Sequence, residues 1–256
     1  GGMMKKDKNT VLPTLLSLIA IGLSIFTLVN NIEVNNKINA IEVERLLDKA
    51  KDFLGDDIGV QSLFIGEETD GNNIELAYRL IRDALVINPK SCRANRLLGI
   101  QYHKKNKYAE ARFAYNNALK IHPDEAELWS LRGFSYYKES NYDSAITEYK
   151  KALSIDSTWL SALDGMAYVY ISQEKWQDAL RYCRSAVISR GSDPVLHWQL
   201  AKVLLKLGKN KEAIGEARKT LSLMPELIDA RRILVSALQA DGQEDEANRQ
   251  LTQVGE

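Results

Sequence analysis

The sequence predicts an all-α protein: a right-handed α-solenoid of helix–turn–helix repeats preceded by one N-terminal transmembrane helix. The first observation is an alanine that recurs every 34 residues, at Ala77, Ala111, Ala145, Ala179, Ala213 and Ala247. A period between about 20 and 50 residues is typical of stacked supersecondary units, in which each unit packs on its neighbours. The second observation is the segment 11–29, which contains no charged residue.

Other positions come into register when the repeats start at residues 58, 92, 126, 160, 194 and 228. The eighth position is small, as Gly99, Gly133, Ala167 and Ala201. We expect these residues where the two helices of a unit cross closely, because a larger side chain would push the helices apart. The eleventh and twenty-fourth positions are mostly large and would fill the wider parts of that interface, as Tyr102, Tyr136, Tyr170, Tyr115 and Tyr149.

Helix-breaking residues also recur in phase. Prolines separate units at Pro89, Pro123 and Pro225. Turn-forming pairs fall between the two helices of a unit, at Asn106-Lys107, Ser140-Asn141, Gly208-Lys209 and Gly242-Gln243. Asp193 followed by Pro194 is typical of a helix N-cap with proline at the first helical position. We therefore predict four full units, 92–125, 126–159, 160–193 and 194–227, and a C-terminal capping unit, 228–256.

The N-terminal end of the repeat array departs from the pattern. Unit 58–91 is predicted to be degenerate, because residues 58–71 carry three glycines and lack the small eighth residue. Residues 31–57 are predicted to be a juxtamembrane helix or linker with one apolar face, made of Val43, Leu46, Leu47, Ala50, Phe53 and Leu54. We expect this face to pack on the first repeat helix, about 73–87. The alternative is a short self-associating coil beside the membrane.

Residues 11–30 are predicted to form the transmembrane helix. The uncharged run 11–29 would be roughly 28 Å long as a helix, close to the ~30 Å hydrocarbon core of a bilayer. A cleaved signal peptide is the main alternative, but the run ends without a small-x-small cleavage site. Residues 1–10 would be an N-terminal tail, in which Gly1 and Gly2 are expected to be a cloning remnant.

The charges that flank the predicted span indicate its orientation. Lys5, Lys6 and Lys8 precede it, whereas Lys37 and Arg45 follow it among several glutamates. The positive-inside rule then places the N-terminus in the cytoplasm and the repeats on the extracytoplasmic side.

The unit 126–159 resembles the tetratricopeptide repeat through Trp129, Gly133, Tyr136, Ala145, Tyr149 and Ala152. The resemblance covers about residues 73–256 and is strongest over 92–159. It implies that the first helices of successive units line a concave face. The residues that it places on this face include a candidate binding set, Arg93, Arg96, His103, Lys104, Phe134, Tyr137, Tyr168, Trp198, Lys202 and Arg232.

Exposed aromatic residues and arginine are enriched in interface hot spots. We therefore expect a groove for a partner protein segment, with acidic groups near Arg93 and Arg96 and apolar anchors toward Trp198. The alternative is that neighbouring helices bury the aromatic side chains. The carboxylate clamp of chaperone-binding family members is absent, because only Arg96 has suitable chemistry at the corresponding positions.

Composition argues against several classes of function. The chain has 34 basic and 34 acidic residues and a formal net charge of zero, so no nucleic-acid partner is expected. Its three histidines are dispersed, with His103 and His122 at opposite ends of one unit and His197 in another, and no catalytic, metal-binding or phosphate-binding motif occurs. We expect no enzyme activity, no metal and no cofactor. Cys92 and Cys183 lie in different units and are expected to be buried free thiols.

The sequence thus predicts a membrane-anchored scaffold or assembly factor that binds partner protein segments on its repeats. One alternative is a permanent structural or accessory subunit of a larger membrane protein complex. Ala20 and Ser24 have the small-xxx-small spacing that would suit a membrane-helix partner. A further alternative is a targeting or import receptor with cytosolic repeats.

Overall fold

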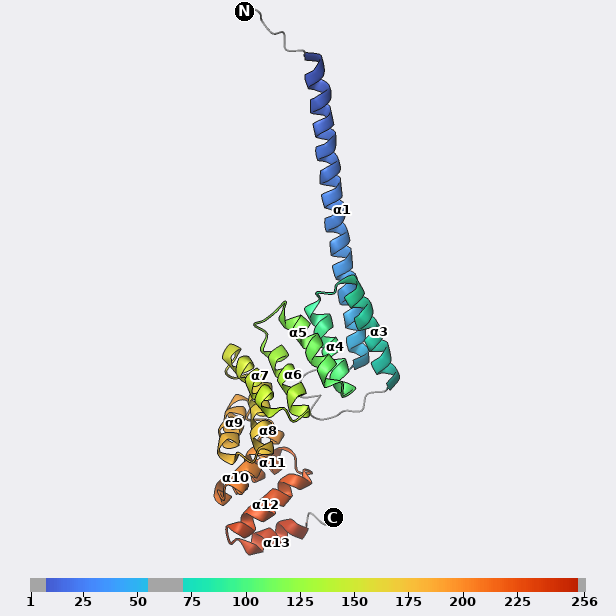
Figure 1. Ribbon diagram of the computed structural model, residues 1–256. Coiled ribbons are helices and arrows are strands. Elements are labelled where there is room, and N and C mark those ends of the chain that lie inside the picture. Colours follow the sequence, from blue (N-terminus) through green and yellow to red (C-terminus); the bar gives the residue numbers. More distant parts are fainter. Residues whose placement is uncertain (1–7, 55–70, 253–256) are drawn as a thin grey trace, which may run out of the picture.

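The computed structural model describes residues 8–54 and 71–252. Within these ranges all regular secondary structure is α-helical, and short turns connect the helices (Figure 1). The two N-terminal helices are α1 (Lys8–Leu54) and α3 (Gly71–Ile87). Ten shorter helices follow: α4 (Cys92–Lys104), α5 (Tyr108–Leu119), α6 (Ala126–Lys138), α7 (Tyr142–Ile155), α8 (Leu160–Ser172), α9 (Trp176–Ser189), α10 (Pro194–Lys206), α11 (Asn210–Leu223), α12 (Ile228–Ala240) and α13 (Glu244–Thr252).

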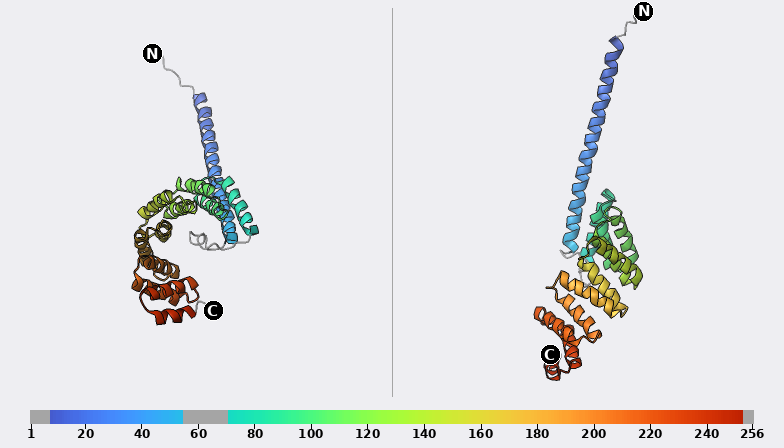
Figure 2. Two further views of the ribbon diagram at one scale, coloured as in Figure 1. Left: turned by 60° about the horizontal axis from the view of Figure 1, so that its bottom comes forward. Right: turned by 90° about the vertical axis from the view of Figure 1, so that its left-hand side faces the viewer.

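The ten shorter helices form five helix–turn–helix units that stack into a curved solenoid (Figure 2). Each helix packs on the helices before and after it in the sequence. The first helices of successive units also contact one another, α4 with α6, α6 with α8 and α10 with α12. Among the described helices, no pair of second helices packs as closely. The first helices therefore line the inner, concave side of the curve.

The alanine repeat marks the most tightly packed positions of the stack. All six alanines lie in the second helix of a pair, and each is 0% exposed. The alanines of the twenty-seventh position lie seven residues, or about two turns, further along the same helices. They are also buried: Ala84, Ala118, Ala152 and Ala186. A methyl side chain at these sites lets two helices approach without leaving a void.

The small eighth residue is required by a tyrosine ring. A Cβ atom added to Gly99 would lie 2.3 Å from the ring of Tyr115. The ring of Tyr149 is enclosed by two glycines, because an added Cβ would lie 3.0 Å from it at Gly133 and 2.3 Å from it at Gly165. Gly133 belongs to the same unit as Tyr149 and Gly165 to the next one, so this ring joins two units.

The turn inside each unit has one conserved geometry along the chain. The fifteenth residue has a positive φ in all five units, at Asn106, Ser140, Glu174, Gly208 and Gly242. The residue after it donates its backbone N–H to the carbonyl five residues earlier, as from Lys107 to Tyr102 at 2.8 Å and from Lys175 to Tyr170 at 2.9 Å. This is the Schellman arrangement that ends helices in the left-handed conformation. It confirms the four predicted turns and adds a fifth at Glu174.

The ends of the helices are also as predicted at two places. Asp193 accepts a hydrogen bond from the backbone N–H of Val195 at 2.9 Å, and Pro194 occupies the first turn of α10. The last helix, α13, buries Ala247 and otherwise exposes or half-exposes its described side chains, mostly polar ones. Such a polar outer face lets the terminal unit close the stack.

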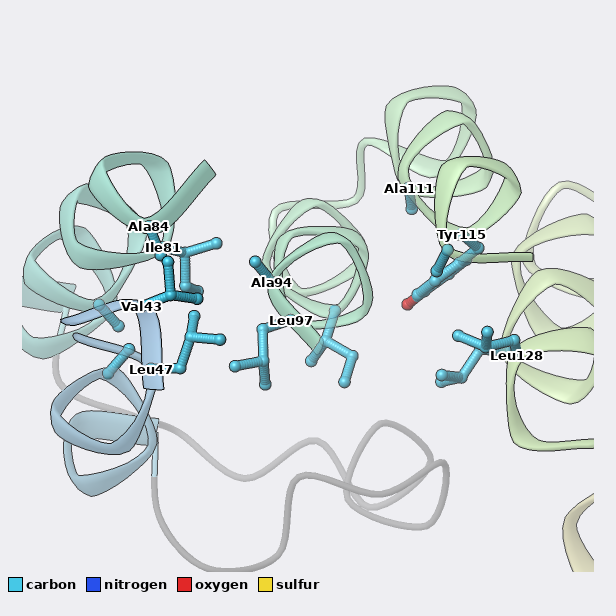
Figure 3. Close-up of a cluster of buried hydrophobic side chains, with 14 of the residues drawn as sticks. Val43, Leu47, Ile81, Ala84, Ala94, Leu97, Ala111, Tyr115 and Leu128 are labelled. Carbon is cyan, nitrogen blue, oxygen red and sulfur yellow. The ribbon is translucent and has the colours of Figure 1, made fainter. Parts of the chain in front are cut away.

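Helix α1 packs on α3, the first described helix of the repeat region. Val43, Leu46, Leu47 and Ala50 of α1 are buried in one cluster with side chains of α3, which include Ala77, Ile81 and Ala84 (Figure 3). Phe53 packs against the same cluster. The expected contact between the apolar face of 31–57 and the first repeat helix is therefore confirmed. Residues 58–70 of the predicted loop lie outside the described residues.

The N-terminal part of α1 projects away from the repeats (Figures 1 and 2). The helix is continuous for 47 residues, about 70 Å, so it joins the predicted span 11–30 to the part of the predicted segment 31–57 that the structure describes. Among the residues whose side chains are described, no helix is both long and apolar enough to cross a membrane. Most of the predicted span, residues 11–20 and 22, lies outside that set, as does the tail at residues 1–7.

The Tyr149 contact leads to a stability prediction. Gly165→Ala should lower the free energy of unfolding by about 1–3 kcal/mol, because the new methyl group displaces a ring that packs on both sides. Urea denaturation followed by circular dichroism measures this change. Gly215→Ala in α11 is the control, since no atom lies within 4 Å of the added Cβ, and it should stabilise by about 0.5–1 kcal/mol. Equal effects of the two substitutions would contradict this account of the packing.

Candidate functional site

The candidate binding residues all lie on the first helices of the units, which line the concave side of the stack. Their distribution is Arg93, Arg96, His103 and Lys104 on α4, Phe134 and Tyr137 on α6, Tyr168 on α8, Trp198 and Lys202 on α10, and Arg232 on α12. Their side chains differ widely in exposure and in the partners that they already have.

The two arginines at the N-terminal end of the face are paired within the chain. Arg93 forms ion pairs with Glu44 and Asp48 of α1, at 2.5 and 2.6 Å. Arg96 donates from one guanidinium nitrogen to both carboxylate oxygens of Glu127 in α6, at 2.6 and 2.7 Å. These carboxylates neutralise the two arginines that were expected to attract acidic groups of a partner, and Arg93 instead joins α4 to α1.

A cleft of about 590 Å³ lies beside these ion pairs. Arg93, Arg96 and Glu127 line one part of the cleft. The other lining residues are Cys92, His122, Asp124 and Glu125. Burial, together with the nearby Glu125 carboxylate, raises the pKa of the Cys92 thiol to about 11, so it stays protonated at neutral pH. Cys92 is half-buried, Cys183 is buried, and both are free thiols.

A row of aromatic rings crosses the middle of the concave side. His103 stacks on Phe134 with ring centroids 4.8 Å apart and an interplanar angle of 10°. The ring centroid of Tyr137 lies 6.1 Å from that of Phe134 and 6.2 Å from that of Tyr168. The row of rings therefore continues from α6 to α8. His103 and Phe134 are only 4% and 1% exposed, whereas Tyr137 and Tyr168 are half-buried. The first two rings therefore form the floor of the row.

Burial also determines the charge of His103. It lowers the pKa of the imidazole to about 4, and the positive charge of Lys138 contributes in the same direction. The ring is therefore neutral at pH 7. His103 thus adds apolar stacking area to the face and no positive charge.

The C-terminal half of the face carries the remaining residues. The indole of Trp198 is half-buried, and the ammonium of Lys202 lies 5.7 Å from its ring centroid. Arg232 is exposed and forms an ion pair with Asp229 of its own helix at 3.3 Å. Arg232 is therefore separated from the aromatic row by one full unit.

The structure also draws attention to Asp164 of α8, which the repeat register places on this face but which is not in the candidate set, and to Gln199 of α10, which the register does not place there. The Oδ1 atom of Asp164 is buried without a hydrogen-bond partner, and so is the Nε2 atom of Gln199, a residue that is 2% exposed. The Gln199 amide lies close enough to lower the pKa of Asp164, but its nitrogen is not in hydrogen-bonding geometry. The sequence does contain a signal for Asp164, because it is a carboxylate at the fifth position of its unit, where the other units carry Arg, Ser or Trp.

Burial raises the pKa of Asp164 to about 7, and the negative charge of Asp193 adds to this effect. The folded protein therefore binds a proton that the unfolded chain releases above its ordinary pKa of 3.8. The stabilisation from the protonated carboxyl is complete below about pH 3.8 and is lost as the pH rises through about 7.

Asp164→Asn should remove this pH dependence, because the amide has no charge to bury. At pH 8 the variant should be more stable than the parent protein by about 1–4 kcal/mol, and the difference should shrink as the pH falls toward 4. Urea denaturation at a series of pH values measures both effects. A difference that stays constant with pH would rule out a buried, titrating carboxyl at this position.

Comparison with known proteins supports a repeat architecture. A family model described as "TPR repeat" matches residues 99–140, and one described as "Tetratricopeptide repeat" matches residues 126–159. A comparison with curated protein sequences finds no match.

Several solved structures share the fold. One described as the functional characterization of pilF from Pseudomonas aeruginosa is 16% identical, with a TM-score of 0.67, and the match covers 86% of this chain and 91% of that chain. MamA from Desulfovibrio magneticus RS-1 is 16% identical with a TM-score of 0.59, covering 64% and 92%. YrrB, described as having an unusual peptide-binding site, is 19% identical with a TM-score of 0.59, covering 68% and 90%. At these identities the likeness concerns the fold.

Proposed function

Because the chain is a tetratricopeptide repeat protein, we propose that it is a non-enzymatic scaffold that binds a segment of a partner protein on its concave side. The observation that carries this proposal is the set of half-buried aromatic residues, Tyr137, Tyr168 and Trp198, presented by three successive units. YrrB, which has a similar fold, is described as having a peptide-binding site, and this supports the same use of the fold here.

The chemistry of the face suits a polypeptide ligand. Tyrosine and tryptophan supply large apolar contact area together with a polar group, and both are enriched at interface hot spots. The row from His103 to Tyr168 is held in place by ring stacking across α4, α6 and α8, so little side-chain ordering is needed on binding. A partner would meet a preformed surface.

We further propose that residues 11–29 anchor the protein to a membrane, with the N-terminus cytoplasmic and the repeats on the opposite side. The described side chains from residue 21 onward support this proposal. Leu23, Phe26 and Leu28 are 61%, 62% and 59% exposed, on a part of α1 that stands away from the repeats. Ile21 and Ile25 extend the same apolar surface around the helix. An apolar surface of this kind indicates contact with lipid or with another helix.

Partner capture tests the scaffold. The full chain, purified in mild detergent, is used to isolate partners that are then identified by mass spectrometry. The double variant Tyr137→Ala/Trp198→Ala should retain no more than about a tenth of the captured partner, since it removes two of the three aromatic anchors. Phe113→Ala on α5 is the control, because Phe113 is 68% exposed on an outer helix. Unchanged capture by a double variant with unchanged helical content would refute binding at this face.

Alkaline extraction of membranes tests the anchor. Leu18→Lys/Ile21→Lys should move the protein from the membrane pellet to the supernatant, because each lysine near the centre of the span costs about 2.5–3.5 kcal/mol. Ile38→Lys is the matched control: Ile38 is 56% exposed on the same helix but lies outside residues 11–29. Membrane retention of the double variant, or equal loss of both variants, would argue against this span.

A further inference from the structure

A small group of polar atoms on the concave side has no partner within the chain. The group consists of the carboxyl Oδ1 of Asp164, the amide Nε2 of Gln199 and the indole Nε1 of Trp198. All three atoms are buried. Buried polar atoms in proteins are nearly always hydrogen-bonded, and each one left unpaired costs about 1–3 kcal/mol. Three such atoms on two neighbouring first helices therefore require an explanation.

The other units show how the same repeat position is normally satisfied. Asp164 and Trp198 occupy the fifth position of their units. At this position Arg96 pairs with Glu127, Ser130 donates to the carbonyl of Ala126 at 3.0 Å, and Arg232 pairs with Asp229. Of these five side chains among the described residues, only Asp164 and Trp198 carry a buried polar atom without a hydrogen-bond partner. Among the fifth-position side chains, the unmet hydrogen-bonding capacity therefore lies on α8 and α10.

The surroundings of Asp164 supply no positive charge. No cation of the described residues lies within ion-pairing distance of its carboxyl, and the charged group that most affects it is Asp193, which is also negative. The other groups around it are Gln199 and the neutral side chains of Tyr149, Tyr168 and Cys183. Lys202 of α10 lies over the ring of Trp198, with its ammonium 5.7 Å from the ring centroid. The carboxylate therefore complements a cation from outside the chain.

We propose that Asp164 receives the ammonium or guanidinium group of a lysine or arginine in the bound partner segment. The aliphatic part of that side chain would lie between Tyr168 and Trp198, whose rings also favour a cation. Gln199 would donate its free N–H to a backbone carbonyl of the same segment. This inference rests on the proposed binding of a partner segment at the concave side and specifies the chemistry of that segment. It places the selective charge at α8 and α10, away from the paired arginines of α4.

The test uses selection of peptides by the purified full chain in detergent. A phage-displayed library of random linear dodecapeptides is panned on the parent protein and on Asp164→Asn. The parent should enrich peptides with lysine or arginine at one shared position, and the variant should lose that preference. Asp178→Asn is the matched control, because it removes one negative charge from an exposed position on α9 and should keep the preference.

Binding of one selected peptide then measures the contact. Replacing its shared lysine or arginine by norleucine should weaken binding to the parent by roughly tenfold or more, as expected for a charge-assisted hydrogen bond. The same replacement should have little effect on binding to Asp164→Asn. Circular dichroism of the variant verifies that its fold is retained.

The possible outcomes separate this inference from the function on which it rests. Selection of peptides without a shared basic residue, or of peptides with a shared acidic one, would overturn the role of Asp164 while leaving partner binding at the concave side intact. An unchanged basic preference in Asp164→Asn would do the same. If the parent protein selects no peptide at all, the proposed scaffold function and this inference both fail.

Discussion

The constraint on which the rest of the structure depends is the close approach of helices at small residues. The six repeated alanines are fully buried, and the ring of Tyr149 fits only because Gly133 and Gly165 carry no Cβ. These contacts set the distance between helices within a unit and between units. Because the first helices come close enough to touch one another, the stack curves and gathers their side chains on one concave side.

The same packing explains how α1 belongs to the solenoid. The apolar face of α1 that includes Val43 and Leu47 packs on α3, the first described helix of the repeat region. The ion pairs of Arg93 with Glu44 and Asp48 then connect α1 to the next unit. A single continuous helix thus both begins the repeat stack and projects from it, so the direction of the projecting part is coupled to the packed core.

Most of the charged candidate residues on the first helices are paired with opposite charges of the same chain. Arg93, Arg96 and Arg232 each have a carboxylate partner within the chain, and His103 is neutral because it is buried. What remains available is aromatic surface and the unpaired carboxyl of Asp164. Positive charge counted along the sequence therefore overstates how basic this face is. Selectivity for a partner depends on the few polar groups that no neighbouring helix satisfies.

The sequence by itself determined the repeat register, the turns within units, the buried alanines and the contact between α1 and α3. These features follow from local chemistry repeated in phase: small residues at crossings, prolines between units and turn formers within them. Only the tertiary structure decided which side chain lies opposite which. Register places a residue on a face, but it does not tell that Glu127 meets Arg96, that Phe134 is covered, or that Asp164 meets no partner. Those outcomes depend on distances between helices far apart in the chain, which packing alone establishes.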